Sequence, residues 1–434
     1  MLLKTLLNRV HPVKGFVYVQ DQMVDDPDRL NGVRIETTLR ARRGCRGYCS
    51  GCGQRGRTYD TLPTRRFDFI PLWGMAVMLL YAPRRIDCSR CGTPKVEMLP
   101  WCVEGVPGAG SKSPMTRALT VFLATWAKRL SWQETSRCFG VSWDSVYRAV
   151  KSVVQFGLNH RDLTGISVIG VDEVAYKKGH RYVTLVYQLD EGCRRLLHVC
   201  EGRSAKSLLS FFVMLRREGR RAGTNFVGSI RYVCSDMWRA YLKVIAKKLP
   251  EAVHILDRYH IVANLNKALD QVRAAEAKKL QAQDWDVLKG SRWLLLRRRK
   301  RLDGKQRWKL HEILKWNLKT VRAYILVQSF DGLWEYKRPS AARKFLRTWC
   351  SGAMRSRIEP IKRVARSLRE HEPLIINWFI AKKQYNSGIV EGLNNRVKLR
   401  TRKAYGMRTY DALQVTLYHE LGKLPEPIVI HRFC

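Results

Sequence analysis

One segment of the sequence changes its hydrophobic pattern several times in a fixed order, and this order limits the folds it can adopt. Apolar runs and alternation predict strands, whereas apolar residues three or four positions apart predict helices. The pattern predicts three strands over 166–171, 181–189 and 194–200, a helix over 204–218, a strand over 230–234, a helix over 238–249 and a last strand over 253–256. The first three strands are expected to form an antiparallel meander, because no helix separates them.

Acidic residues stand at the ends of two of these strands. Asp172 follows the first predicted strand, and Asp236 follows the fourth. The order of elements is that of an RNase H-like α/β fold, whose first and fourth strands pair, so the two aspartates are expected to be neighbours. Each acid alone also fits a solvated helix cap or a surface ion pair. Asp236, for example, can cap a helix that begins at Trp238.

A third acid, Glu391, lies far along the chain in a predicted helix that opens near Ser387 and carries Asn394 and Lys398 on the same face. Three carboxylates can hold two Mg²⁺ ions about 3.5–4 Å apart, an arrangement that activates an attacking oxygen and stabilises a leaving one. Asp172, Asp236 and Glu391 are therefore the predicted magnesium ligands of a site for phosphodiester chemistry.

The charge balance indicates a polyanionic partner. The 434 residues include 80 lysines and arginines against 37 acids, a formal net charge of +43. The excess runs from Arg40 to Arg408, which favours nucleic acid over general solubility or attraction to a membrane surface. No signal-peptide pattern opens the chain, and the most apolar run, 70–81, is shorter than the ~18 residues of a membrane span. We expect a soluble, intracellular protein.

Two near-identical pentapeptides predict a zinc site. They are Cys49-Ser-Gly-Cys52-Gly53 and Cys88-Ser-Arg-Cys91-Gly92. A two-residue gap lets both thiolates reach one tetrahedral ion at about 2.3 Å, and four sulfurs leave no position for a catalytic water. Zn²⁺ is therefore expected to be structural. Reduced structural thiols are the alternative, and Cys45 could replace Cys49 or Cys52 as a ligand.

The segment between these knuckles, 57–87, is predicted to form the strands of a zinc ribbon. Arg65 and Arg66 lie in it, and we expect them on a surface that contacts DNA. Arg396, Lys398 and Arg400, in the helix of Glu391, are further DNA-binding candidates.

A tri-helical unit is predicted after the zinc ribbon. Ser113-Pro114 is expected to open a helix that runs to Leu130, and Ser131 with Glu134 has the form of a capping box. Gly140 provides a turn into a third helix, which is expected to extend to about Val150. If the unit is a helix-turn-helix, the last helix offers these residues to the major groove: Trp143, Ser145, Tyr147, Arg148 and Lys151. The alternative is an ordinary helical hairpin.

A long region rich in helix formers, 263–375, is predicted to be a helical insertion. Its basic run consists of Arg297, Arg298, Arg299, Lys300 and Arg301, which we expect to contact phosphates. Six tryptophans surround this run: Trp285, Trp293, Trp308, Trp316, Trp334 and Trp349. Such residues can stack on distorted DNA, but we expect most of them to form the core of the helical region.

Several motifs in order resemble the DDE transposases of bacterial insertion sequences of the ISL-three (ISL3) family. These are Gly170-Val-Asp172-Glu-Val-Ala-Tyr-Lys-Lys-Gly-His180, Ser235-Asp236-Met-Trp238, Leu256-Asp257-Arg-Tyr-His260 and Ser387-Gly-Ile-Val-Glu391-Gly-Leu-Asn-Asn-Arg-Val-Lys398. The resemblance covers about Cys45 to Leu421 and implies a metal-binding triad of Asp172, Asp236 and Glu391. It also implies a role for His260 near the scissile phosphate. The alternative is that Asp257 caps a helix and His260 merely occupies its first turn.

The resemblance implies a multidomain α/β protein with six segments. They are an N-terminal segment (1–40), a zinc ribbon (41–110), a helix-turn-helix (111–160), the first part of an RNase H-like domain (161–262), a helical insertion (263–375), and the rest of that domain with a last helix over it (376–434). Residues 1–40 contain little that indicates a structure, and a dimer contact and a short helix are the two alternatives for them.

The implied function is DNA transposition in the bacterial cytoplasm, at the nucleoid. The protein is expected to bind terminal inverted repeats of double-stranded DNA as a homodimer or higher oligomer, to cut the element ends and to join 3′ hydroxyls to target DNA. A domesticated DNA-binding regulator without catalysis, and a nuclease without strand transfer, are the alternatives.

Overall fold

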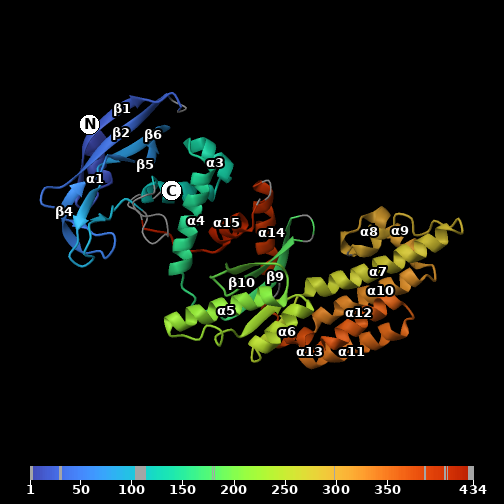
Figure 1. Ribbon diagram of the computed structural model, residues 1–434. Helices are drawn as coiled ribbons and strands as arrows, with labels where there is room; N and C mark the ends of the chain where they lie inside the picture. Colours follow the sequence, from blue (N-terminus) through green and yellow to red (C-terminus); the bar gives the residue numbers. More distant parts are fainter. Residues whose placement is uncertain are drawn as a thin grey trace. The chain divides into compact units, whose positions relative to one another are not determined.

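The computed structural model describes residues 3–28, 32–102, 114–177, 179, 181–297, 299–385, 388–404, 407 and 409–428. The chain divides into two compact units, of which the first is Met1–Asp162 with Leu399–Cys434 and the second is Leu163–Lys398 (Figure 1). Helix α14 (Gly388–Lys403) contributes residues to both units. Among the described residues, no helix is long and apolar enough to cross a membrane.

The first unit opens with a short helix and a four-stranded sheet. In spatial order the strands are β1 (Phe16–Asp25), β2 (Val33–Ala41), β6 (Met75–Tyr81) and β5 (Arg65–Leu72), preceded in the chain by α1 (Leu3–Val10). Their alternating apolar residues pack around Trp101, whose ring meets those of Phe16 and Phe67 edge-on. Residues 1–40 thus supply both a short helix and half of a sheet, and the boundary expected at residue 40 falls inside β2.

A second small sheet carries the cysteine knuckles. Its order is β3 (Gly47–Tyr48), β4 (Arg55–Thr61), β7 (Arg84–Asp87) and β8 (Lys95–Val96). The hairpin β5–β6, which lies between β4 and β7 in the chain, does not belong to this sheet; β6 pairs with β2 instead. The zinc-ribbon strands expected over 57–87 are therefore only β4 and β7. The inserted hairpin accounts for the wide spacing of the two knuckles.

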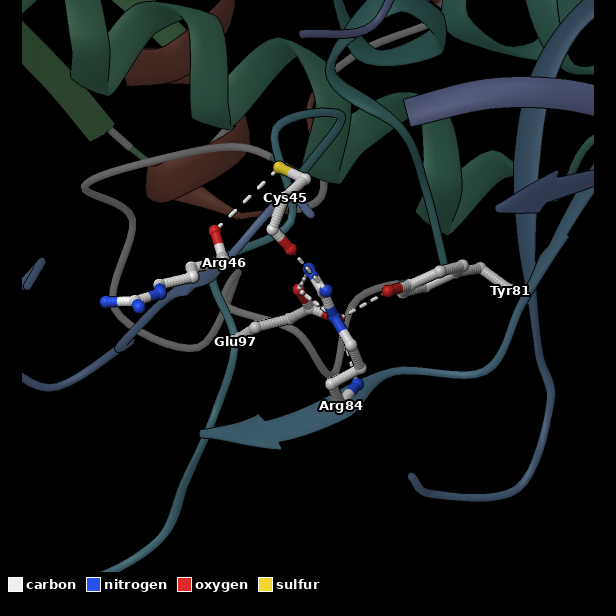
Figure 2. Close-up of polar contacts among 5 residues, drawn as sticks. All are labelled: Cys45, Arg46, Tyr81, Arg84 and Glu97. Atoms are coloured by element: carbon white, nitrogen blue, oxygen red, sulfur yellow. Dashed lines mark hydrogen bonds and ion pairs between the residues drawn. The ribbon is translucent and has the colours of Figure 1, made fainter. Parts of the chain in front are cut away.

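A buried carboxylate joins these two sheets (Figure 2). Glu97 is 1% exposed and accepts a 2.5 Å hydrogen bond from the hydroxyl of Tyr81, at the end of β6. It also forms a 2.6 Å ion pair with Arg84, the first residue of β7, and Arg84 donates to the carbonyl of Cys45 at 2.8 Å. Burial raises the pKa of the Tyr81 hydroxyl, and the Glu97 hydrogen bond raises it further. Glu97 therefore fixes the two sheets to each other.

Three helices follow, as the sequence predicts, but the first begins later. They are α2 (Arg117–Ala127), α3 (Trp132–Phe139) and α4 (Trp143–His160). The capping box of Ser131 with Glu134 is present, and Gly140 ends α3 in the left-handed region. Thr116 caps α2, whereas Pro114 accepts a hydrogen bond from the backbone of Asp68 in β5. Ser113, the expected cap, lies outside the described residues.

The last helix was expected over the catalytic sheet, and the structure corrects this. Helix α15 (Tyr410–Leu421) belongs to the first unit and packs on α4. Its Asp411 forms a 2.8 Å ion pair with Lys151 and accepts a hydrogen bond from Tyr147. Gly157 of α4 lacks the Cβ that would lie 2.5 Å from the Cβ of Leu424, so the segment after α15 approaches closely. Side chains on α4 therefore hold this helix within the first unit.

The second unit is built on a five-stranded sheet with the predicted order of elements. Its spatial order is β11 (Arg195–Glu201), β10 (Arg181–Gln188), β9 (Val168–Lys177), β12 (Tyr232–Ser235) and β13 (Val253–Leu256). The first three strands form an antiparallel meander, and β12 runs parallel to both β9 and β13. The first and fourth strands along the chain, β9 and β12, are therefore neighbours, as predicted.

Helices pack on both faces of this sheet, and successive residues of β9 face helices on opposite sides. Ile169 and Val171 of β9 belong to a core with α5 (Ala205–Ala222) and α6 (Arg239–Lys248). Gly170 points to the opposite face, where a Cβ would lie 2.6 Å from a methyl group of Val390 in α14. Because Asp172 is two residues beyond Gly170, it shares the face on which α14 packs.

A helical region extends from the end of β13 (Figure 1). It comprises α7 (Arg258–Gln281), α8 (Arg292–Leu296), η1 (Arg299–Arg301), α9 (Gly304–Leu314), α10 (Lys319–Phe330), η2 (Asp331–Glu335), α11 (Pro339–Arg355), α12 (Glu359–Glu370) and α13 (Glu372–Ile380). The boundaries expected at 262 and 375 both fall inside helices, α7 and α13. The helical region is therefore connected to the sheet domain by helices that continue across both expected boundaries.

The tryptophans of this region are mostly not in its core, contrary to the expectation. Trp334 and Trp349 are buried with Phe330 between them. The other four have 37% or more of their surface exposed, namely Trp285, Trp293, Trp308 and Trp316. These four lie on the short helices α8 and α9 and the loops beside them, where the helices are too short to enclose large rings.

Candidate active site and zinc site

Three aspartates lie side by side where the parallel strands of the second unit meet. The last paired residues are Cys234 with Gly170, and Ser235 with Leu256. Asp236 directly follows β12, Asp257 directly follows β13, and Asp172 lies two residues beyond Gly170. Continuing the register therefore places Asp236 between Asp172 and Asp257. The predicted pair of aspartates is brought together, with a third beside it.

Asp172 is held from two sides. Its Oδ1 accepts a 2.8 Å hydrogen bond from the backbone of Glu173, and its Oδ2 accepts a 2.5 Å bond from Nδ2 of Asn394 in α14. The Oδ1 atom of Asn394 in turn accepts a 2.8 Å bond from the hydroxyl of Tyr187, which is fully buried in β10. A chain of buried groups thus joins two strands of the sheet to α14.

Burial and mutual repulsion make the cluster unfavourable for negative charge. Burial raises the pKa of Asp172 to about 6, and the charges of Asp236 and Asp257 add to this effect. Burial likewise raises the pKa of Asp236, while the amide of Trp238, which donates to its Oδ1 at 3.0 Å, lowers it. The helix-cap alternative for Asp236 therefore holds in part, because Asp236 orders the chain just before α6.

Glu173 is a fourth acid of the cluster, which the sequence reasoning missed. Burial raises its pKa to about 7, and repulsion from Asp236 and Asp172 raises it further. Its Oε2 atom is buried without a hydrogen-bond partner among the described residues. Asp172 and Glu173 are successive residues of β9, so strand alternation directs their side chains to opposite faces of the sheet, and Glu173 adds buried negative charge near the aspartates. The adjacent position of Glu173 in the motif was the available signal.

Glu391 lies apart from this cluster. It is in the first turn of α14 with an exposed side chain, one turn before the buried Asn394. Among the described residues, the four cysteines are the only group of three or more metal-ligand atoms within 4.8 Å of one another. The structure therefore brings the helix of Glu391 to Asp172 without closing a three-carboxylate site. Ser387, the expected start of this helix, lies outside the described residues.

The helix-cap interpretation of Asp257 and His260 is confirmed, and the role of His260 near the scissile phosphate stays a prediction. Asp257 caps α7 by accepting a 2.7 Å bond from the amide of Tyr259, and His260 lies in the first turn with Nε2 3.6 Å from Asp257 Oδ2. His260 is also close enough to Asp172 and Asp236 to lower the pKa of each. The helix cap is thus what brings the imidazole to the acidic cluster.

The four predicted zinc ligands converge, and Cys45 is not among them. The sulfurs of Cys49, Cys52, Cys88 and Cys91 all lie within 4.8 Å of one another. Two of their separations are 3.8 Å, between Cys49 and Cys91, and 3.4 Å, between Cys52 and Cys88. A tetrahedral ion with bonds of about 2.3 Å requires sulfur separations of about 3.8 Å. The cluster therefore fits structural zinc.

Local backbone geometry prepares these sulfurs for a cation. The amide of Gly51 donates to the Cys49 sulfur at 3.4 Å. The amide of Cys91 lowers the pKa of the Cys88 thiol to about 7, and the Cys52 thiol lowers it further. Cys45 instead has its sulfur 3.8 Å from the carbonyl oxygen of Arg46 (Figure 2), and lies against Gly15.

The DNA-binding candidates of α4 fall into two groups. Trp143 and Arg148 are exposed, and Ser145 is half-buried. Trp143 stacks on Tyr147, with ring centroids 5.6 Å apart and planes 11° apart. Tyr147 and Lys151 both bind Asp411 of α15. The first turn of α4 is thus free to meet a ligand, whereas the second is partly occupied.

The other basic candidates differ in their surroundings. Arg66 has an exposed side chain 3.6 Å from Glu36, and the Arg65 guanidinium lies 5.3 Å from the centre of the Phe67 ring. Arg400 binds the carbonyl of Leu130 and forms a 2.8 Å ion pair with Glu420, so it is engaged within the first unit. The exposed members are Arg297, Arg299, Arg301, Arg396 and Lys398. Arg298 and the side chain of Lys300 lie outside the described residues.

Comparison with known proteins assigns the class. A family described as transposase, the ISL3-type DDE transposases, matches residues 169–417. The chain is 30% identical to the transposase of insertion sequence element IS1001 from Bordetella parapertussis, over 94% of this chain and 96% of the relative. It is 26% identical to the transposase of element IS1557 from Mycobacterium tuberculosis, over 91% and 90% of the two chains.

Adjacent carboxylates at the end of two paired strands, in a strongly basic chain, agree with the class of enzymes that act on DNA. The chain belongs to the ISL3 family of DDE transposases, and its function is DNA transposition. Members of this class require a divalent metal ion, and the acidic cluster described above has the donors for one.

Proposed function

We propose that this transposase binds the terminal inverted repeats of its element, cuts the DNA at the element ends and joins the freed 3′ hydroxyls to target DNA. The observation that carries the proposal is the placement of Asp172 and Asp236 on adjacent parallel strands, with α14 held against Asp172 by Asn394. The strand order, with three antiparallel strands followed by two parallel ones, supports an RNase H-like catalytic domain formed by 161–262 and 376–398.

In this proposal Asp172, Asp236 and Glu391 hold two Mg²⁺ ions. Bound divalent ions activate the attacking oxygen and stabilise the leaving oxygen of a phosphodiester. The side chains of the chain itself provide the geometry. Asn394 and the Glu173 amide orient Asp172, and the Trp238 amide orients Asp236. Glu391 is in the first turn of α14, one turn before Asn394, so the hydrogen bond of Asn394 to Asp172 brings the helix of Glu391 to the aspartates.

We propose that His260 is a positioning residue beside the scissile phosphate. Its imidazole lies in the first turn of α7, where the amides at the helix start favour an anion. Its distance of 3.6 Å to Asp257 gives the ring a fixed orientation next to the acidic cluster. His260→Ala is expected to slow cleavage while DNA binding is retained.

The first unit supplies DNA recognition in this proposal. The cysteine cluster with β3, β4, β7 and β8 is a zinc-ribbon head, and the neighbouring four-stranded sheet presents Arg65 and Arg66 from β5. Residues 111–160 are a helix-turn-helix that presents Trp143, Ser145 and Arg148. The basic surface of 263–375 neutralises phosphates. Because two element ends must be held together, the active form is a homodimer or larger oligomer, and it works in the bacterial cytoplasm, where its DNA substrate lies.

Two other activities are separated from this proposal by one experiment. The full chain is incubated with DNA that carries an element end, together with Mg²⁺ and a supercoiled target. Joined products support the proposal, binding without chemistry indicates a DNA-binding regulator, and cleavage without joining indicates a nuclease. Asp236→Ala should bind the same DNA but form no joined product. Joining by this variant would overturn the assignment of the acidic cluster.

A further inference from the structure

Four exposed tryptophans gather on one short stretch of the helical region. Trp308 is 68% exposed and Trp293 is 60% exposed, and Trp316 and Trp285 meet edge-on with ring centroids 4.9 Å apart. Large aromatic rings rarely remain in water unless a partner covers them. Residues 285–316 also contain eleven lysines and arginines against three acids. The surface therefore offers apolar ring faces and positive charge together.

A groove on this surface combines the two features. It has a volume of about 400 Å³ and is lined by Trp293, Leu294, Arg297, Lys305 and Lys309, with Gly290 and Gln306. Trp293 and Leu294 come from α8, and the two lysines lie one turn apart on α9. None of the lining residues is acidic. A volume of this size is at the lower end of the range typical of sites that hold a small organic molecule.

The acids nearest in sequence are engaged elsewhere and do not neutralise the groove. Asp303 caps α9 by accepting a 2.8 Å bond from the amide of Gln306. Asp286 pairs with Lys289 at 2.8 Å, and Asp270 pairs with Arg292 at 3.0 Å. Glu312 pairs with Lys315 at 2.6 Å, so none of these acids pairs with a cation that lines the groove. Lys309 also donates to the carbonyl oxygen of Lys289 at 3.2 Å, which leaves its positive charge in the groove.

The Trp293 ring has one face already occupied. The guanidinium of Arg292 lies 5.2 Å from the ring centre, in a cation–π contact that fixes the ring. One ring face is therefore left for a planar ligand. A ligand that has both a planar group and phosphates can stack on the immobilised ring and also contact the three cations. A bare anion lacks the planar group, and an apolar peptide lacks the negative charge.

We propose that this groove binds an unpaired nucleotide of single-stranded DNA. The base stacks on Trp293, and Arg297, Lys305 and Lys309 contact the flanking phosphates. Intact duplex cannot fill the groove in this way, because its base faces are covered by neighbouring bases. The inference rests on the proposed function, since cutting at element ends is what produces unpaired DNA near the enzyme.

The test is a binding measurement without divalent metal, made on the full chain carrying Asp236→Ala, so that catalysis plays no part. The probe is fluorescent oligothymidine, compared with a duplex of the same length. Trp293→Ala should weaken single-strand binding by about 5- to 100-fold and change duplex binding by less than about 2-fold. Trp293→Phe, which keeps a ring, should restore most of the loss. Trp73→Ala, at a tryptophan that is 82% exposed in the first unit, is the matched control and should change neither.

The outcomes separate this inference from the proposed function. An unchanged affinity for single-stranded DNA in Trp293→Ala overturns the proposal that the groove is the binding site. An equal loss of affinity for single-stranded DNA and duplex also overturns it, because such a loss indicates a general phosphate contact. Recovery with Trp293→Phe excludes misfolding as the cause. A chain that binds single strands through Trp293 but never joins DNA would leave the groove intact and remove only the proposed strand transfer.

Discussion

Asn394 of α14 donates a 2.5 Å hydrogen bond to Asp172 of β9, across 222 residues of sequence. Asn394 is 5% exposed, and its own carbonyl is held by Tyr187, so the amide has one orientation. The bond sets the position of α14 against the sheet, and with it the position of Glu391, one turn earlier. Asn394 is thus a positioning residue for two of the three proposed metal ligands.

Replacing Asn394 by alanine should reduce DNA cleavage by about 10- to 100-fold, the range expected when a group that orients a metal ligand is removed. The requirement for Mg²⁺ should rise, while affinity for element-end DNA measured without metal should not change. Tyr187→Phe removes only the hydroxyl that orients Asn394, and should give a smaller loss of the same kind. Equal Mg²⁺ dependence in wild type and Asn394→Ala would contradict the role.

Gly170 permits the close approach of α14, because a Cβ there would lie 2.6 Å from a methyl group of Val390. Gly170→Ala should cost roughly 1–3 kcal/mol in the free energy of unfolding and should also slow cleavage, since α14 must shift. Val390→Ala in the same chain removes the clashing methyl groups and should recover part of both. Purely additive losses in the double variant would contradict this explanation.

Hydrophobic periodicity predicts the order of the strands and helices, and this order predicts the neighbouring aspartates because the first and fourth strands of an RNase H-like fold pair, as β9 and β12 do. The contact of Asn394 with Asp172 is different. It depends on how a helix from a distant part of the chain packs on the sheet, which no local pattern records. The same limit applies to Glu173, since strand alternation alone places its side chain on the other face from Asp172.

The zinc-binding region shows which features local sequence motifs predict and which they do not. The spacing of Cys88 and Cys91 predicts the knuckle because two ligands three positions apart suffice to define it. The hairpin β5–β6 was expected to pair within the ribbon, yet it pairs with β2. Apolar residues of β5 and β6 pack in the core that contains Trp101.

Cys88→Ser should remove zinc from the protein, lowering its content from about one ion per chain to almost none. Strands β3 and β8 of this sheet have two residues each, too few to persist without a cross-link, so the sheet should unfold. The measurement is zinc content together with protease sensitivity between β3 and β8. Cys45→Ser is the matched control, because Cys45 is outside the cluster, and should keep its zinc.

Glu97→Ala should destabilise the first unit by about 3–5 kcal/mol, because it leaves the partly buried Arg84 without its partner. Asp60→Ala breaks the ion pair with Arg85, the next residue in the same strand, but that pair is about 40% exposed on both sides. The loss of the exposed pair should change the unfolding midpoint much less than the loss of Glu97. Similar unfolding midpoints for the two variants would show that Glu97 does not join the sheets.

His254 makes the stability of the second unit depend on pH. It lies 6% exposed in β13 with Nε2 2.8 Å from Ser235 Oγ, and burial lowers its pKa to about 4, helped by His371. An unfolded histidine has a pKa of about 6.5, so between these values only the unfolded chain takes up the proton. The stabilisation is therefore complete above about pH 6.5 and is lost as the pH falls toward 4.

His254→Gln removes this titration while keeping a side chain that can bond to Ser235. Between about pH 7 and pH 5 the free energy of unfolding of the wild type should fall by about 2 kcal/mol more than that of the variant. Asp172, whose pKa burial raises to about 6, titrates in the same range, but it is common to both proteins and cancels in the difference. Parallel pH profiles in urea unfolding would mean that His254 is protonated equally in the folded and unfolded chains.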